Sequence, residues 1–219
     1  MTQAKAYKGM GMEGRVAKWY AKTTRSAMDD FKVLAKRMSE GLTEGSSVLE
    51  VAPGPGYFAI ELAKLGNYKI TGLDISKTFV DIASKNARAE GVEVNFRHGN
   101  ASSMPFEDNT FDRIVCRAAF KNFADPVGAL KEMRRVLRPG GKALIIDLRK
   151  DTPKEVIAEH VDNMKIGPLD SAFTKLAFRT FLLRRAYTRD NFTKFIAESG
   201  FQKSEIDEAP LGFEIWLAK

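Results

Sequence analysis

The sequence predicts an α/β fold, a doubly wound and mostly parallel sheet of seven strands with a helical cap, and three observations support it. Short apolar segments typical of strands alternate with segments of helical spacing between residues 45 and 150. A glycine-rich turn, "APGPG" at residues 52–56, joins the first such strand to the first helix. The length of 219 residues and the hydrophobic content of 44% suit one domain with one core.

The expected strands and helices follow one another in a regular order. Apolar residues of the first 40 positions are spaced by three and four, which predicts one or two helices that stop at Gly41. Strands are expected at 47–52, 68–74, 92–99, 111–119, 142–150, 202–210 and 212–219. Helices are expected at 57–66, 76–91, 125–141 and 188–201, with Ser76 and Asp125 as N-caps and Gly91 after a C-terminus.

One connection between strands is much longer than the others. Residues 153–186 have helical spacing without an intervening strand, so the connection is enlarged by about 35 residues, and such excursions from a compact domain are usually functional. From the helical spacing of the first 40 positions we also expect an N-terminal helical cap at residues 1–40. The main domain is expected at 41–219, with a helical insertion at about 151–187.

Composition and charge exclude several classes of protein. The single cysteine, Cys116, cannot form an internal disulfide or a cysteine-based metal site, and no metal site is predicted. No apolar segment is long enough for a membrane span or a signal peptide, so we expect a cytoplasmic protein, either a monomer or a homodimer. The net charge of +7, concentrated in residues 1–40 and 165–189, fits an acidic partner or a solvated surface.

The glycine-rich turn predicts a ligand that approaches the main chain at Gly54 and Gly56, although an ordinary tight turn is the simpler alternative. Asp74 favours the ligand. It ends the second expected strand, 18 residues beyond Gly56, where a carboxylate can accept both hydroxyls of a ribose. Ser76 already supplies the N-cap of the next helix, so Asp74 is free for a nucleotide-like cofactor.

Two classes of cofactor fit these residues. "GPGYFA" satisfies the dinucleotide fingerprint, so NAD is one alternative. Against it, the sequence has no Tyr-x-x-x-Lys pair and no cysteine or histidine arrangement for hydride chemistry. Glu50 lies just before the turn, where a carboxylate would repel a second phosphate and would suit an ammonium group.

Four segments together resemble a known family. They are "VLEVAPGPGYFAIELA", "ITGLDIS", "HGNASSMPFEDNTFDRIV" and "ALKEMRRVLRPGGKALIID". In this order and spacing they resemble the class I S-adenosylmethionine-dependent methyltransferases, in particular the small-molecule group that includes the ubiquinone and menaquinone biosynthesis methyltransferases. The resemblance covers roughly residues 45–150 and implies S-adenosyl-L-methionine as the cofactor.

The resemblance also implies the positions of the cofactor-binding residues. The loop from Glu50 to Gly56 would surround the methionine part, Asp74 would hold the ribose and Ile75 would pack on the adenine. Asn100 and Ala101 would meet the adenine edge, and Arg117 and Ala118 would lie beside the sulfonium. Two residues depart from the family pattern: Ala52 stands where a glycine is usual, and Asn100 where aspartate is most frequent.

The substrate side is less defined. Lys121 and Asn122 match positions that face the substrate in the quinone methyltransferases, and a plain turn before Asp125 is an equal alternative. Tyr7 and Tyr20 come from the segment that folds over the cofactor in this family, with Tyr7 expected as a gate. For Trp19, in the same segment, the helical spacing favours the core instead.

Charge and histidine content give two more expectations. Arg184 belongs to a group of cations on the insertion that favours an anionic substrate; the group is Lys165, Lys175, Arg179, Arg184, Arg185 and Arg189. His160, beside the apolar stripe of the inserted helix, is the candidate general base if the acceptor must lose a proton. The alternative is a surface histidine beside Glu159 or Asp162.

These observations predict direct displacement of an activated methyl group by a small-molecule acceptor, in which the protein mainly aligns the reactants. An RNA methyltransferase is the first alternative, encouraged by the isoelectric point of 9.4. The absence of N-P-P-Y, D-P-P-Y and catalytic cysteine motifs argues against it, and we expect no nucleic-acid partner. The second alternative is a cofactor-binding protein without methyl transfer.

Overall fold

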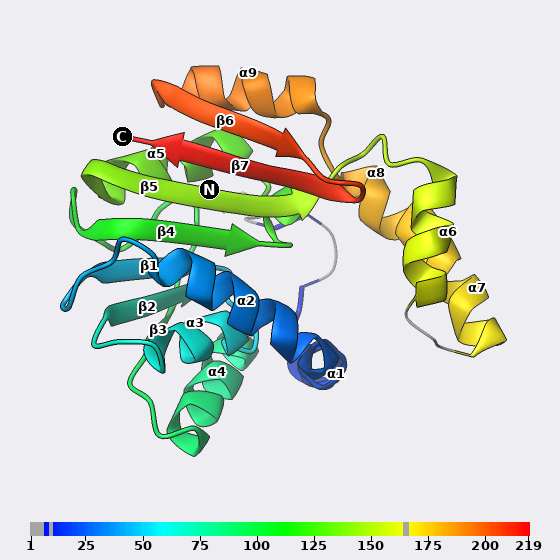
Figure 1. The fold of residues 1–219 in the computed structure, drawn as a ribbon, viewed down its shortest axis with the longest axis horizontal. Coiled ribbons are helices and arrows are strands. Elements are labelled where there is room, and N and C mark those ends of the chain that lie inside the picture. The colour runs from blue at the N-terminus through cyan, green and yellow to red at the C-terminus, as the bar shows by residue number, and fades with distance from the viewer. Residues whose placement is uncertain (1–6, 9–10, 164–166) are drawn as a thin grey trace, which may run out of the picture.

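A seven-stranded sheet forms the centre of the molecule in the computed structural model, which describes residues 7–8, 11–163 and 167–219. The strand order is β3-β2-β1-β4-β5-β7-β6, and helices cover both faces (Figure 1). The prediction of a doubly wound, mostly parallel α/β fold is therefore confirmed.

The first five strands are parallel and the last two close the sheet antiparallel to them. The strands are β1 Ser47–Val51, β2 Lys69–Asp74, β3 Asn95–His98, β4 Phe111–Arg117, β5 Leu137–Leu148, β6 Lys203–Glu208 and β7 Gly212–Ala218. Because parallel strands point the same way, the carboxyl ends of β1, β2, β4 and β5 meet at one edge, here called the carboxyl edge.

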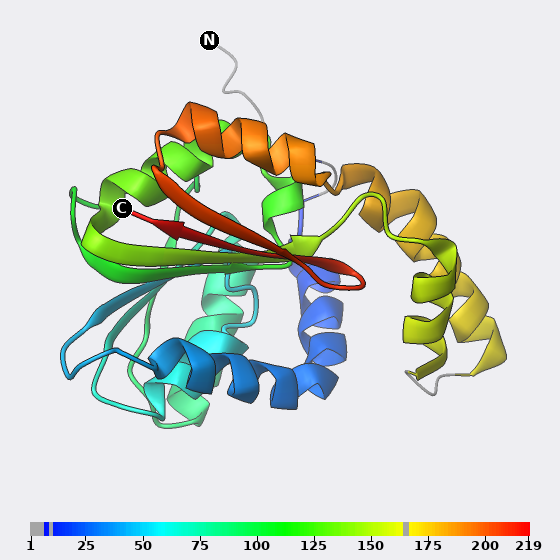
Figure 2. The same cartoon turned by 45° about the horizontal axis from the view of Figure 1, so that its top comes forward.

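Each face of the sheet has its own helical layer (Figure 2). On one face lie α2 Met28–Ser39, α3 Tyr57–Ala63 and α4 Lys77–Ala89; on the other lie α5 Pro126–Val136 and α9 Arg189–Ser199. The expected N-caps are present, since Ser76 Oγ accepts from Phe79 N and Asp125 accepts from Gly128 N. Two clusters of buried apolar side chains, one on each face, fix the layers to the sheet.

Strand β5 begins earlier than the sequence indicates. Leu137 pairs with Phe111, so the "LRPGG" segment already belongs to the sheet. Gly140 turns there with φ 80°, a backbone region that favours glycine, and its N–H donates to Lys219 O over 2.9 Å. The end of the chain thus holds the start of β5.

The N-terminal 40 residues divide between two positions. Helix α2 buries Leu34 and Met38 on the sheet, whereas α1 Gly14–Thr24, followed by a 3₁₀ turn at Arg25–Ala27, lies at the carboxyl edge (Figure 1). In α1 only Ala17 and Ala21 are buried. Trp19 is 65% exposed, so its expected place in the core is wrong: the small alanines, one turn apart, form the contact face instead.

The enlarged connection forms an arm that projects beyond the carboxyl edge (Figures 1 and 2). It consists of α6 Lys154–Asn163, α7 Pro168–Ala177, a π-helical turn at Phe178–Leu182 and α8 Leu183–Arg185. A small separate cluster of Ile157, Val161, Leu183 and Ala186 holds the base of the arm together. Among the described residues no helix is long and apolar enough to cross a membrane.

Candidate active site

The glycine-rich turn lies at the carboxyl edge between β1 and α3. Ala52, Gly54 and Gly56 all have positive φ, at 57°, 54° and 80°. A Cβ on Gly54 would meet only a Tyr20 ring carbon at 3.9 Å. A Cβ on Gly56 would lie 2.6 Å from the Phe96 ring, so this glycine permits close packing of the turn against β3. Gly54 therefore leaves its side of the turn open to a ligand.

Asp74 ends β2 and holds the turn from behind. Its Oδ2 accepts from Gly54 N at 3.0 Å and its Oδ1 from Ser76 N at 2.8 Å. The residue is 5% exposed, and burial raises the pKa of this carboxyl to about 6, although its backbone donors favour the charged form. The carboxylate of Asp74 thus links the glycine-rich turn to the start of α4.

Glu50 is a second buried carboxylate, one strand away. Its Oε2 accepts from Ala59 N at 3.1 Å. Burial raises its pKa to about 8, and the negative charge of Asp74 adds to the rise. Neither carboxylate has an ion-pair partner among the described residues. A ligand with a positive charge would relieve this burial cost, so the pair fits a cationic group such as an ammonium or a sulfonium.

The three residues expected at the adenine are exposed or half-buried. Ile75 is 38% exposed, which is unusual for a large apolar residue in this chain and leaves its side chain free to cover a flat ring. Asn100 Oδ1 accepts from Ser102 N at 3.0 Å and keeps a second lone pair. Ala101 is half-buried against the core.

Arg117, the last residue of β4, connects the carboxyl edge to α2. Its guanidinium carbon lies 4.5 Å from the centre of the Phe31 ring, and Nη2 lies 3.7 Å from Asp30 Oδ2. The positive charge also opposes the raised pKa of Glu50. Arg117 is therefore fixed from the α2 side.

Lys121 lies in a buried ion pair at the ends of β4 and β5. It belongs to a 3₁₀ turn at Phe120–Asn122, and its Nζ lies 2.9 Å from Asp147 Oδ1. The two side chains are 6% and 1% exposed. Asp147 Oδ2 also accepts from Lys121 N at 2.8 Å. The neighbouring Asn122 is half-buried, and its carbonyl accepts from Lys8 N at 2.7 Å.

Tyr7 and Tyr20 reach the carboxyl edge from the N-terminal segment. Tyr7 forms a β-bridge with Phe123, and burial raises the pKa of its hydroxyl while the nearby Arg185 lowers it. Tyr20 packs edge to face on Phe79 with ring centres 5.8 Å apart, and burial also raises its pKa. Tyr20, Asp74 and Asp147 also raise the pKa of Tyr7, and the two aspartates also raise the pKa of Tyr20, so both hydroxyls lie within electrostatic range of these carboxylates.

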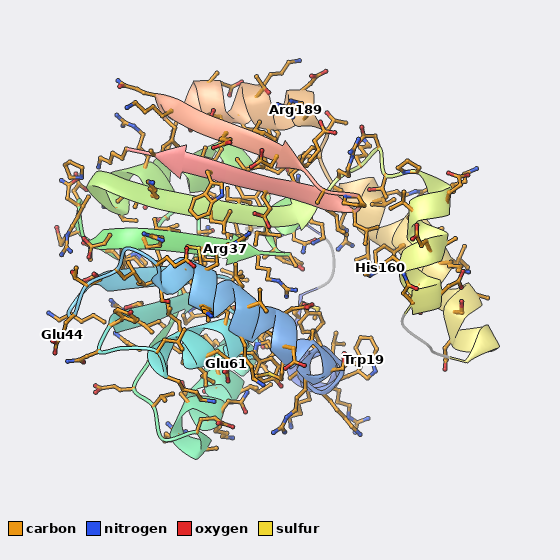
Figure 3. The ribbon with its side chains drawn as sticks, viewed as in Figure 1. Trp19, Arg37, Glu44, Glu61, His160 and Arg189 are labelled. Atoms are coloured by element: carbon orange, nitrogen blue, oxygen red, sulfur yellow. The ribbon has the colours of Figure 1, made fainter. Side chains whose placement is uncertain are left out.

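His160 and Arg184 lie on the arm and not among these residues. The His160 ring lies 5.9 Å from the Phe178 ring, and Figure 3 shows the residue on α6. Arg184 is exposed. It lines a shallow pocket of about 270 Å³ at the base of the arm; the pocket is formed by Lys150, Thr152, Lys154, Ile157, Leu183 and Arg184. Lys165, another expected cation, lies outside the described residues.

Sequence reasoning did not find two carboxylates of the site. Asp147 is the next-to-last residue of the apolar strand β5 and could have been found by the same rule that identified Asp74. Glu13 has no such signal. Its carboxylate accepts from Lys77 N at 3.0 Å and Thr78 N at 3.1 Å, and its charge raises the pKa of Asp74. Because the partners are 64 and 65 residues away, no local pattern indicates this contact.

Comparison with known proteins supplies independent findings. Residues 49–145 match the family model of a methyltransferase domain. A demethylmenaquinone methyltransferase of Chlorobaculum parvum is 30% identical over 194 residues, which cover 84% of this chain and 78% of the relative. The ubiquinone/menaquinone biosynthesis C-methyltransferase of Bdellovibrio bacteriovorus is 38% identical over 110 residues, 49% of this chain and 47% of that protein.

Among solved structures, a SAM-dependent methyltransferase from Aquifex aeolicus superimposes with a TM-score of 0.69 and 21% identity. The match covers 92% of this chain and 95% of that one. At this identity the likeness concerns the fold.

Proposed function

Because the chain belongs to the class I S-adenosylmethionine-dependent methyltransferases, we propose that its acceptor is a hydroxylated ring of the quinone type in its reduced form. The enzyme transfers the methyl group of S-adenosylmethionine to a small molecule. The observation that carries the choice of acceptor is the similarity to demethylmenaquinone methyltransferase over 78% of that relative's length.

In this proposal the cofactor lies along the carboxyl edge from Glu50 to Asn100. Asp74 accepts the ribose hydroxyls, and Glu50 faces the amino group of the methionine part. Two observations support this arrangement. Glu50 is buried without an ion-pair partner among the described residues, which suits an ammonium group, and Asp74 is a buried hydrogen-bond acceptor beside the glycine-rich turn. Gly54, Ile75, Asn100 and Ala101 complete the proposed cofactor side, with Ala52 and Gly56 shaping the turn.

The bound cofactor supplies a methyl group that its positive sulfur already activates, so the residues of this chain need mainly to orient the acceptor. Tyr7 and Tyr20 are proposed to enclose the acceptor, with Asn122 beside them. Arg117 would favour an ionised oxygen on the ring. Lys121 acts in this proposal through Asp147, by keeping the ends of β4 and β5 in position. It is therefore a positioning residue more than a group that reacts.

The positive charge at the base of the arm leads us to propose that the acceptor is anionic. Lys150, Lys154 and Arg184 line the shallow pocket at the base of the arm, and this concentration of positive charge would attract a carboxylate or a phenolate. His160, on α6 of the same arm, remains the proposed base for an acceptor that must lose a proton.

A labelled-methyl assay tests the proposed function. The purified enzyme is incubated with S-adenosylmethionine carrying a tritiated methyl group and with a reduced demethylnaphthoquinone, a catechol, an aromatic carboxylate or bulk RNA in separate reactions. We expect label in the naphthoquinol. Label in RNA alone would contradict the proposal in favour of an RNA methyltransferase. Tight cofactor binding with no labelled product from a metabolite extract would instead indicate a cofactor-binding protein without methyl transfer.

A further inference from the structure

The outer face of α1 has an unusual composition for a surface helix. Its inner face is formed by Ala17 and Ala21, which are 0% and 8% exposed. Trp19 lies on the opposite side and is 65% exposed, with Arg15 four residues before it and Lys22 three residues after it. At this spacing the two cations flank the indole on one surface. Figure 3 shows Trp19 directed away from the sheet, on the side where the arm lies.

Two more side chains extend this face. Lys18 is exposed on one flank, and Val16, on the other, is 37% exposed. No acidic residue occurs within α1, and none of its three cations forms a salt bridge with a described residue. Cations elsewhere differ: Arg37 pairs with Glu214 and Lys64 with Glu61. The outer face of α1 is thus an exposed aromatic ring among unneutralised positive charges.

We propose that the outer face of α1 docks on the surface of an anionic lipid bilayer. Tryptophan is enriched at the boundary between lipid headgroups and acyl chains, and Lys and Arg beside it attract anionic headgroups. The side chains of this face match both parts of that boundary. Single-stranded nucleic acid is the other polyanion that binds aromatic and basic residues, but it is held in a groove, whereas α1 presents a convex helix.

The position of α1 gives the docking a consequence for the active site. Its inner side carries Tyr20, whose ring faces Gly54 across the cofactor turn. The α1 helix and the arm lie at the same carboxyl edge in both ribbon views (Figures 1 and 2). On the arm, Leu176 and Leu182 are 56% and 36% exposed. A bilayer that binds α1 would therefore lie close to the mouth of the site, where the acceptor of the proposed function could enter directly.

Vesicle sedimentation with the full chain tests the proposal. Vesicles contain either phosphatidylcholine alone or phosphatidylcholine with about a third phosphatidylglycerol, at low and at high salt. Binding is expected only to the anionic vesicles and is expected to fall at high salt. Each cation near the surface contributes about fivefold, so the variant R15Q/K18Q/K22Q should bind about 100-fold more weakly. Trp19→Ser should weaken binding at both salt concentrations.

Matched control variants lie on the other side of the molecule. K131Q/K194Q/K203Q removes three exposed cations from α5, α9 and β6, and Leu65→Ser removes an apolar residue that is 48% exposed. Both controls should bind anionic vesicles like the unmodified chain. Equal losses in the control and α1 variants would indicate attraction by net charge alone and would overturn the proposal, as would equal binding to neutral vesicles.

Fluorescence reports on the indole itself. The chain has two tryptophans, so Trp216→Phe leaves Trp19 as the only one. Its emission should shift to the blue and become protected from acrylamide when anionic vesicles are added. Emission that is already blue and protected without vesicles would show that another part of the chain covers this face. A shift produced by single-stranded RNA and not by vesicles would also overturn the proposal.

Discussion

Two neighbouring halves of the carboxyl edge differ in whether their buried carboxylates have a salt-bridge partner. At β1 and β2, Glu50 and Asp74 receive hydrogen bonds from backbone N–H groups but no salt bridge from the described part of the chain. At β4 and β5, Asp147 is just as buried and pairs with Lys121 over 2.9 Å. The half at β1 and β2 thus has no counterpart of Lys121 within the described residues. This difference fits the proposed cationic ligand in the first half and a structural ion pair in the second.

The largest expected effect comes from breaking the internal pair. Lys121→Met leaves Asp147 buried without its cation, and removal of one partner of a buried pair typically costs 3–5 kcal/mol. Because Asp147 keeps backbone donors in Lys121 and Leu148, we expect the lower end, about 3 kcal/mol of unfolding free energy in urea denaturation. The variant K121M/D147N should recover most of the loss. A stability change within about 0.5 kcal/mol for K121M alone would mean that the pair is not structural.

Removing the carboxylate on the ligand side should affect binding first. In Asp74→Ala, two hydrogen bonds from the ribose to a charged acceptor are lost, about 1.5–3 kcal/mol each before compensation by water. We expect Kd to rise about 100-fold for both S-adenosylmethionine and its demethylated product, measured by calorimetric titration. Asp74→Asn keeps an acceptor oxygen and should lose less. Unchanged affinity in the alanine variant would remove Asp74 from the site.

His160, on the arm, is the candidate general base. For an acceptor that must lose a proton, His160→Ala should lower kcat by about 100-fold, the usual scale of general-base assistance. Glu155→Gln, at an exposed position of the same helix, provides the control. The pH dependence of kcat decides the role: the same rate and profile in H160A as in the unmodified enzyme would exclude His160 as the base.

The raised pKa of Glu50 predicts a pH dependence of stability. Its folded pKa of about 8 lies above the ordinary 4.5, so the folded protein binds more protons between these values and loses stability as pH rises through them. The slope is at most about 1.4 kcal/mol per pH unit. A bound cationic cofactor should lower the pKa of Glu50, because it favours the charged carboxylate. Cofactor binding near pH 7 should therefore release protons. Calorimetry in buffers of different ionisation enthalpy measures the release, and Glu50→Gln should reduce it.

The smallest expected effect concerns backbone strain in the turn. Ala52 adopts φ 57°, which costs a residue with a side chain about 1–2 kcal/mol relative to glycine. Glycine also gains entropy in the unfolded chain, so Ala52→Gly should raise the unfolding free energy by only about 0.5–1 kcal/mol. Leu49→Ala in the adjacent strand serves as a contrast that should destabilise. A fall in stability in A52G would show that the alanine side chain contributes packing.

The two halves of the edge also differ in how well the sequence predicts them. Gly54, Asp74 and Ser76 lie close to strand ends and helix starts, where a local pattern has a direct structural cause. The mostly parallel sheet with helices on both faces followed from the same alternation of strands and helices, whereas the order of the strands was not predicted. Lys121 could be located at the end of β4, but its partner Asp147 lies 26 residues further along and only the fold brings them together.

Surface exposure was the least predictable property. Trp19 has the helical spacing of a core residue, yet the contact face of α1 runs through Ala17 and Ala21. Helical spacing identifies residues on a common face but does not say which face is buried when both contain apolar side chains. The arm is a similar case, because His160 and Arg184 belong to helices whose position relative to the sheet no local pattern specifies.

The contact of Glu13 with the start of α4 has a consequence for the order in which the chain assembles. The carboxylate accepts from Lys77 N and Thr78 N, which leave the ribosome 64 and 65 residues later. Helix α1 therefore has no anchor during early synthesis and can dock only after β2 and α4 have formed. Its few buried residues allow it to detach again without unfolding the sheet. Hydrogen exchange should accordingly show α1 opening more readily than β1 and β4.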